Sequence, residues 1–161
     1  MKKFTISLTL LFLAFSAQIG FGQNTPSNKE TIIKAARFLE ENPFDKDAKK
    51  IRIEAIKSIR QPGIGRFIAC SIDFKSIIPP SYKFRNNLLA VYFIGRAAFV
   101  LENPEKSGDP DVSMVGGMES MVKSYEQMVK MNSKAKLAKL DDLTTARKNN
   151  SLASLFTCLD F

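Results

Sequence analysis

The chain of 161 residues contains no histidine, no tryptophan and only two cysteines. Without histidine it cannot form a Ser-His-Asp or Cys-His nucleophile system, a histidine-ligated zinc or haem site, or a histidine pH switch. It also has no Cys-x-x-Cys pair, no glycine-rich phosphate loop and no carboxylates at metal-ligand spacing. These absences exclude most catalytic classes, so we expect a protein that is not an enzyme and holds no cofactor.

The composition is that of an ordinary globular protein. Hydrophobic residues make up 45% of the chain and charged residues 25%, which argues against wholesale disorder. A chain of this length supplies material for one hydrophobic core and leaves no room for a second. We therefore expect a single compact domain.

The N-terminal residues have the form of a secretory signal peptide. Two lysines follow the first methionine, the run 4–15 is mostly apolar, and Gly20-Phe21-Gly22 places small residues at positions −3 and −1 of a cleavage site. We therefore predict a signal peptide over residues 1–22, cleaved near Gly22, and a helical domain over residues 23–161. The protein is expected to be exported to the periplasm or secreted.

Two alternatives to this cleavage exist, a second site at Ala14-Phe15-Ser16 and an uncleaved membrane anchor. The anchor is disfavoured because polar residues interrupt the apolar stretch before it reaches the ~20 residues that a span requires. These polar residues are Ser7, Thr9, Ser16 and Gln18. No cysteine lies near the cleavage region, so a lipid anchor is excluded. We expect no stable membrane span after cleavage.

Removal of the signal peptide also changes the charge. It leaves 22 of the 24 basic residues against 16 acidic ones, so the net charge falls from +8 to +6. A positive excess favours acidic partners such as anionic polymers, lipid headgroups or acidic proteins. Nucleic acid is disfavoured as a partner because of the predicted compartment.

Apolar residues recur at helical spacing in segments separated by proline, glycine and asparagine. Segment 64–78 also shows the alternation of a strand, but a lone strand would have no partner, so we predict a helix. Segment 82–101 is apolar around much of its circumference, which predicts the central buried helix. The expected fold is all-α, with six to seven helices packed as antiparallel αα-hairpins. The predicted segments, caps included, are 27–42, 45–59, 64–78, 82–101, 111–131, 133–147 and 151–159.

Several helix ends have recognisable signals. Ser27 and Glu30 have the spacing of a capping box, in which Ser27 accepts a hydrogen bond from the Glu30 amide. Asp45 and Ser151 are expected to cap the helices that follow them. Asn42-Pro43 is expected to end the first helix, because proline disfavours helical backbone in the residue before it.

A short sequence recurs 61 positions apart. Residues 38–43 read Phe-Leu-Glu-Glu-Asn-Pro, residues 99–104 read Phe-Val-Leu-Glu-Asn-Pro, and Ala36 and Ala97 align before them. This pattern resembles tetratricopeptide-type helical hairpins, in which an alanine-rich helix ends at a proline. The whole chain is also similar to short exported bacterial helical proteins with no assigned activity. The resemblance implies helical hairpins and no reaction; two independent Asn-Pro helix stops are the alternative.

Cys70 and Cys158 are the only thiols. In an exported protein, two cysteines favour a disulfide. Cys70 shares a helical stripe with Phe67 and Phe74, and Cys158 follows Leu155 by three positions, so both are expected to face inward. Two separate buried thiols are the alternative.

Methionines gather on the segment 111–131. Thioether sulfur is a soft ligand, so the row is a candidate Cu(I) site. Valines run beside it, however, and Gly116-Gly117 would let a neighbouring helix approach closely, so we predict that these methionines fill the core. The row consists of Met114, Met118, Met121 and Met128.

Basic residues form two runs. Such runs on amphipathic helices are usually the solvated face, but on one shared surface they would form an anion-binding patch. The first run is Lys46, Lys49, Lys50, Arg52, Lys57 and Arg60. The second is Lys123, Lys130, Lys134, Lys136 and Lys139.

Three functional hypotheses follow. The first is an exported helical binding module that contacts a protein or an anionic ligand. The second is a helical carrier of a lipid or another apolar molecule, favoured by the phenylalanine-rich segment 82–101 and the methionine row. The third and most remote is a hydrolase that uses Ser120 and Lys123, which have Ser-x-x-Lys spacing and share a helix face.

Overall fold

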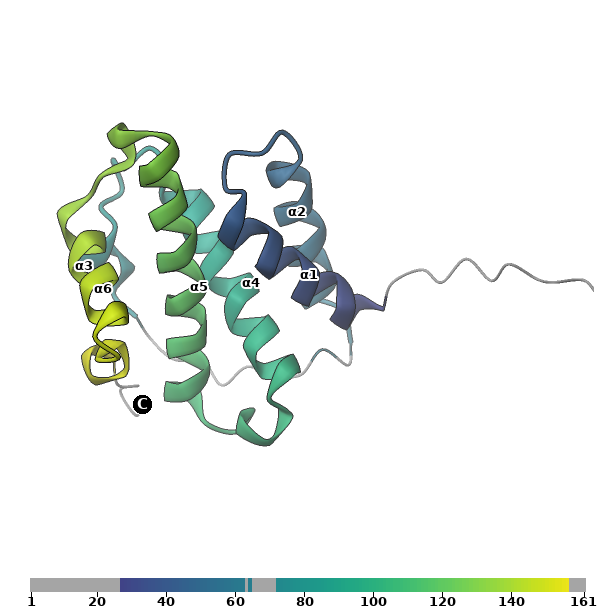
Figure 1. Cartoon of the computed structure of the whole chain (residues 1–161). Coiled ribbons are helices and arrows are strands. Elements are labelled where there is room, and N and C mark those ends of the chain that lie inside the picture. The colour runs from purple at the N-terminus through teal and green to yellow at the C-terminus, as the bar shows by residue number, and fades with distance from the viewer. Residues whose placement is uncertain (1–26, 63, 65–71, 157–161) are drawn as a thin grey trace, which may run out of the picture.

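The computed structural model describes residues 27–62, 64 and 72–156. They form six α-helices and three short 3-10 helices, and no strand occurs among them (Figure 1). The all-α prediction is therefore confirmed. The α-helices are α1 (Asn28–Glu41), α2 (Ala48–Ile59), α3 (Phe74–Ile77), α4 (Arg85–Glu102), α5 (Pro110–Met131) and α6 (Ala138–Lys148). The 3-10 helices are η1 (Pro104–Lys106), η2 (Ser133–Ala135) and η3 (Leu152–Leu155).

Both Asn-Pro sequences end a helix in the same way. Asn42 and Asn103 have nearly equal backbone angles, with φ of −126° and −130°. In each case the backbone N–H and the side-chain amide donate to the carbonyl four residues earlier, that of Phe38 or Phe99. These bonds satisfy a carbonyl that the helix end would leave open. Each stop is followed by a short turn into the next helix, which gives the hairpins α1–α2 and α4–α5.

The two hairpins pack against each other around α4. Helix α4 contacts α5, α1 and α2, while α6 and η3 pack on α5 (Figure 1). One face of α4 supplies Leu88 and Tyr92 to a core shared with α5 and α6. Another face supplies Ile94 and Ala97 to a core shared with α1 and α2. The prediction that this helix is central and buried is confirmed.

The methionine row lies in the first of these cores. Met114, Met118, Met121 and Met128 are all buried. Gly117 stands against the ring and carbonyl oxygen of Tyr92, where an added Cβ would come within 2.9 Å of that oxygen. The close approach expected at Gly116-Gly117 is therefore present, and the methionines pack the core.

Some predicted helix boundaries are wrong. Within the described residues, the segment 64–78 contains only the four-residue helix α3, because Asp73 leaves the helical conformation and caps it by accepting from the Lys75 amide. Asp45 does not cap α2, because Asp47 stands immediately before the helix and the Asp45 carboxylate accepts from the Asp47 amide. Ser27 does cap α1, accepting from the Glu30 amide at 3.2 Å.

The segment expected to be one helix over 133–147 is divided in two. Ser133–Ala135 forms η2, residues 136 and 137 are extended, and α6 begins at Ala138. The reason is tertiary: Tyr82 donates to the Ala135 carbonyl at 2.6 Å, and the Leu137 amide donates to the Tyr125 hydroxyl at 2.9 Å. These bonds replace those of a continuous helix.

The last predicted helix also differs from the structure. Up to residue 156, where the described part ends, this segment contains only the short 3-10 helix η3, and Ser151 makes no side-chain cap. Its hydroxyl donates instead to the Ala146 carbonyl, back toward α6. Residues 157–159 of the predicted helix lie outside the described residues. In the part of the chain described, no helix is long and apolar enough to cross a lipid bilayer.

Candidate anion-binding surface on the second helix

Helix α2 turns a narrow face inward. Its buried residues are Ala48 and Ala55, whose small side chains bring the helix close to α1 and α4. Ile51, Ile56 and Ile59 are partly buried beside them and pack against the same core. The lysines of the first basic run lie on the exposed side of this segment.

A groove of about 430 Å³ separates α2 from the first half of α4. Its ionisable lining residues are all basic, and Asn87 and Ala90 of α4 form the opposite wall. Ile53 and Ile56 contribute an apolar part of the lining between the cations. The basic lining residues are Lys49, Arg52, Lys57 and Arg60.

Arg52 differs from the exposed lysines around it. Its guanidinium is half-buried, and Nη1 is buried without a hydrogen-bond partner among the described residues. This desolvation lowers the pKa of Arg52 from its usual value. An arginine nevertheless remains charged at neutral pH, so the groove holds a partly dehydrated cation.

A second groove lies beside the first one on α2. Lys49, Ile53 and Lys57 are four residues apart on α2 and line both grooves, and Ile53 is 47% exposed. The second groove also contains Glu54, whose carboxylate lies 3.9 Å from Lys50 Nζ. The positive charge of the second groove is thus partly compensated, unlike that of the groove facing α4.

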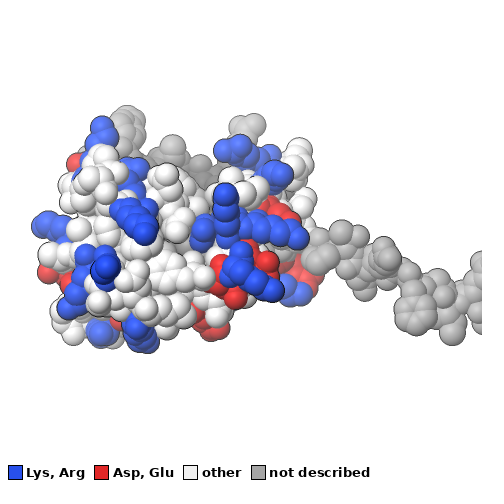
Figure 2. All heavy atoms as spheres, turned by 90° about the horizontal axis from the view of Figure 1, so that it is seen from above, with Lys and Arg blue, Asp and Glu red and all other residues white. Residues whose placement is uncertain are grey.

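The second basic run lies elsewhere in the bundle. Lys130 is in the last turn of α5, Lys134 is in η2 and Lys136 follows η2, all exposed. Figure 1 shows α2 and α6 on opposite sides of the α4–α5 pair. Seen from above, the basic side chains form separate groups with uncharged surface between them (Figure 2). On the face that Figure 2 shows, the basic groups are therefore separate.

Lys123, predicted with the second run, points to a buried carboxylate instead. Glu40 on α1 is 6% exposed and accepts from Ser120 at 2.5 Å and from Arg37 at 2.7 Å, and Lys123 Nζ lies 3.4 Å from it. Arg37 also pairs with Glu102 of α4. Ser120 and Lys123 do converge on Glu40, but Ser120 is only 2% exposed and its hydroxyl donates a hydrogen bond to Glu40. This geometry gives Ser120 a structural role and offers no support for a Ser/Lys hydrolase.

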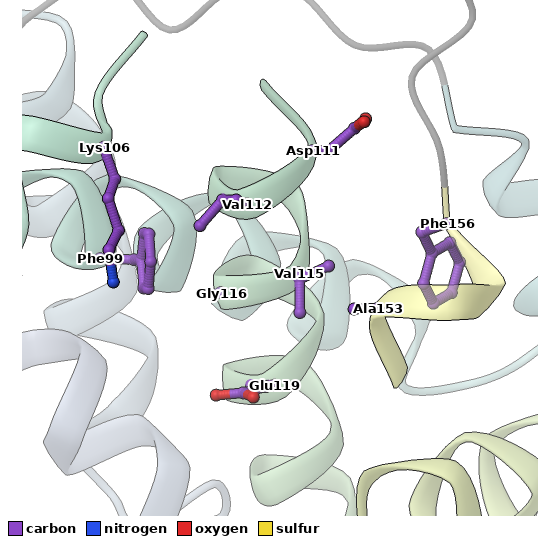
Figure 3. Close-up of a pocket in the computed structure, with 9 residues that line it drawn as sticks. All are labelled: Phe99, Lys106, Asp111, Val112, Val115, Gly116, Glu119, Ala153 and Phe156. Carbon is purple, nitrogen blue, oxygen red and sulfur yellow. The ribbon is translucent and has the colours of Figure 1, made fainter. Parts of the chain in front are cut away.

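A further pocket of about 400 Å³ lies between α4, α5 and η3. Figure 3 shows Val112 and Val115 of α5 between Phe99 of α4 on one side and Phe156, after η3, on the other. Gly116 lets the Phe99 ring pack directly on α5, since an added Cβ would lie 2.5 Å from that ring. Three charged side chains also line this mostly apolar pocket: Lys106, Asp111 and Glu119.

Two predictions concern residues outside those the structure describes. Cys70 and Cys158 both lie there, so their disulfide remains a prediction. The same holds for residues 1–22 and for cleavage near Gly22. The candidate surface on α2 contains none of these residues.

Comparisons with protein-family models, curated proteins and solved structures give no match. The chain is all-helical, and no family or homologue supplies a function for it. The interpretation of the α2 surface therefore rests on the chemistry of its own side chains.

The sequence identified the basic residues of α2 but not the α4 residues that face them across the groove. Asn87 and Ala90 belong to α4, and neither carries a motif or lies in a basic run. Helical periodicity shows which side of a helix is polar and does not show which helix lies opposite. The isolation of Arg52 Nη1 likewise required the packed structure.

Proposed function

We propose that this protein is an exported helical binding module that holds an anionic ligand against α2. One observation carries the proposal: four cations line the groove between α2 and α4, and none forms an ion pair with a described carboxylate. Some cations elsewhere do form ion pairs, as Lys34 does with Glu30 and Arg147 with Glu126. An uncompensated cluster of like charges is relieved by an anion.

The expected strength of this interaction is modest. An exposed ion pair contributes about 0.2–1 kcal/mol. Three such contacts, from Lys49, Lys57 and Arg60, would therefore strengthen binding by roughly three- to 150-fold at low salt. The interaction should weaken as salt is added, because exposed charges are screened.

The test is retention of the purified protein on a sulfonated resin. We expect the double variant Lys49→Gln, Lys57→Gln to elute at clearly lower salt than the unaltered protein. The matched control, Lys134→Gln with Lys136→Gln, removes the same charge from the other basic run and should elute closer to the unaltered protein. Equal shifts for both pairs would mean that only net charge matters, which contradicts the proposal.

The hairpin architecture supports a binding role. In α1–α2 and α4–α5, helices that end with the same Asn cap lead through short turns into second helices. This is consistent with the tetratricopeptide-type hairpins that the sequence resembles, which present helix faces to partners. We accordingly interpret the two hairpins as a duplicated unit. In this interpretation, α2 is the second helix of the first copy.

The pocket between α4, α5 and η3 supports a second candidate function, an apolar carrier. Its walls are mostly apolar, with Val112, Val115 and Phe156 among them. Titration with an apolar fluorescent probe, 1-N-phenylnaphthylamine, tests this function. A carrier should enhance the probe's fluorescence and lose that enhancement with Val115→Asp. Enhancement that survives the substitution, or none at all, would rule this pocket out.

A further inference from the structure

We propose that Arg52 is the recognition residue of the α2–α4 groove and holds the phosphate group of an alkyl phosphate monoester. The apolar part of that ligand would lie on Ile53, Ile56 and Ala90. This inference rests on the proposed anion-binding function. It adds the chemical class of the ligand and the residue that binds its phosphate group.

The arginines of the chain divide into two groups. Within the described residues, four of the six donate to an oxygen of the protein: Arg37 to Glu40, Arg85 to Ile78, Arg96 to Ser113 and Arg147 to Glu126. Arg52 and Arg60 have no such partner in that part of the chain, and both line the groove. The two described guanidinium groups that lack an acceptor in the protein thus line the same groove.

Arg52 also carries a buried donor that requires an acceptor. Buried polar groups in native proteins are nearly always hydrogen-bonded, and each exception needs a physical reason. Leaving such a donor unsatisfied costs free energy. A phosphate oxygen in the groove would recover it by drawing the guanidinium outward, since Arg52 already lines the groove. Arg147 makes the contrast clear, since its Nε is also unsatisfied but its Nη2 donates to Glu126 at 2.6 Å. Arg52 lacks an equivalent carboxylate.

The charge of the groove favours phosphate over carboxylate. A phosphate monoester carries nearly two negative charges at neutral pH and three strong acceptor oxygens. Four cations surround the groove, and Arg52 offers a planar fork that matches a phosphate bidentately. A carboxylate would leave most of this positive charge uncompensated. Asn87, on the opposite wall, adds an amide that can donate to a further oxygen.

The size and lining of the groove point to an ester with an apolar group. Its volume of about 430 Å³ falls within the range of about 300–1,000 Å³ of small-molecule sites. Ile53, Ile56 and Ala90 give part of it an apolar surface. An alkyl chain beside the phosphate would cover that surface, whereas inorganic phosphate would leave it exposed. The headgroup of phosphatidic acid and a soluble alkyl phosphate share this monoester chemistry.

The experiment is calorimetric titration of the full mature protein with hexyl phosphate, with inorganic phosphate as a second probe. We expect hexyl phosphate to bind more tightly than inorganic phosphate. Arg52→Gln should weaken the binding of hexyl phosphate by at least about tenfold, as expected from loss of a charge-assisted hydrogen bond. Arg52→Lys, which keeps the charge and loses the fork, should weaken it less. Lys50→Gln is the matched control, because it removes one charge of α2 outside this groove.

The outcomes separate the two proposals. In one outcome, the double variant Lys49→Gln, Lys57→Gln is retained less on the sulfonated resin, but Arg52→Gln and Lys50→Gln weaken hexyl phosphate binding equally. The proposed function then stands and this inference fails. If neither the resin nor hexyl phosphate distinguishes any variant, both fail. Sedimentation with phosphatidylcholine vesicles, with and without phosphatidic acid, then identifies the source. Binding that depends on phosphatidic acid and on Arg52 indicates a lipid headgroup, and binding of hexyl phosphate alone indicates a soluble ester.

Discussion

Gly95 lies at a close contact between α4 and α5, and its replacement by alanine tests the packing of these two helices. A Cβ at position 95 would lie 2.2 Å from Ser120 Cβ and 2.3 Å from Ser120 Oγ. Carbon atoms in contact prefer a separation of about 3.5–4.0 Å, so the new methyl is short by about 1.3 Å. Ser120 cannot simply rotate away, because its Cβ is fixed by the backbone and its hydroxyl is bonded to Glu40. The two helices must move apart.

The magnitude follows from three contributions. Overpacking a filled core costs about 1–3 kcal/mol. Displacing the Ser120 hydroxyl weakens a bond to a buried carboxylate, whose full loss costs about 1.5–3 kcal/mol. Replacing glycine by alanine within a helix regains at most about 1 kcal/mol. We therefore expect a net loss of about 2–4 kcal/mol in the free energy of unfolding, or roughly 5–15 °C in melting temperature.

Urea and thermal unfolding followed by circular dichroism measure this loss. Gly108→Ala is the control, since a Cβ there meets nothing within 4 Å, and it should be neutral or stabilise by up to about 1 kcal/mol. In the Gly95→Ala background, Ser120→Gly should recover part of the loss because it removes both clashing atoms. Ser120→Ala should not, because its Cβ remains. A Gly95→Ala protein as stable as the unaltered one would refute the close approach of α4 and α5.

Three further predictions follow from other parts of the molecule. Glu40→Ala should lower the free energy of unfolding in urea by about 3–5 kcal/mol, because it leaves Lys123 and its neighbours without their buried counter-charge, while Glu40→Gln should cost less. Arg52→Met should keep or raise the melting temperature, since it removes an unsatisfied buried donor, whereas Arg147→Met should lower it by breaking the pair with Glu126. Burial and the nearby Asp141 raise the pKa of Tyr82 from 10 to about 12. The neutral tyrosine therefore adds to the free energy of unfolding fully below pH 10, and this addition is lost as the pH rises from 10 to 12. Tyrosinate absorbance and urea midpoints across this range check the last prediction, and a Tyr82→Phe protein should lose less stability there.

The helices that the sequence predicted well are those with strong local signals. Ser27 at the start of α1 and the two Asn-Pro stops act within one turn of the chain, so their hydrogen bonds involve residues three or four positions away. Long apolar stripes likewise identified α4 and α5. Interactions this local are visible in the order of residues alone.

The errors occur where distant residues control the backbone. Two extended residues before α6 are held by Tyr82 and Tyr125, whose hydroxyls bond to the backbone of Ala135 and Leu137. Tyr82 is 53 positions from its partner, and no periodic pattern reveals such a bond. The burial of Ser120 was also not visible in the sequence, because its hydroxyl donates a hydrogen bond to Glu40, 80 positions away.

By itself, the sequence determined the helical class, the main helix stops, the burial of the methionine row and the presence of a basic, mostly exposed α2. These features depend on side-chain periodicity and on hydrogen bonds between near neighbours. Only the tertiary structure decided that α4 faces the cations of α2, that Arg52 Nη1 lies buried without an acceptor, and that Lys123 turns to Glu40. Those features depend on which helices meet, and that is settled by packing among residues far apart in the chain.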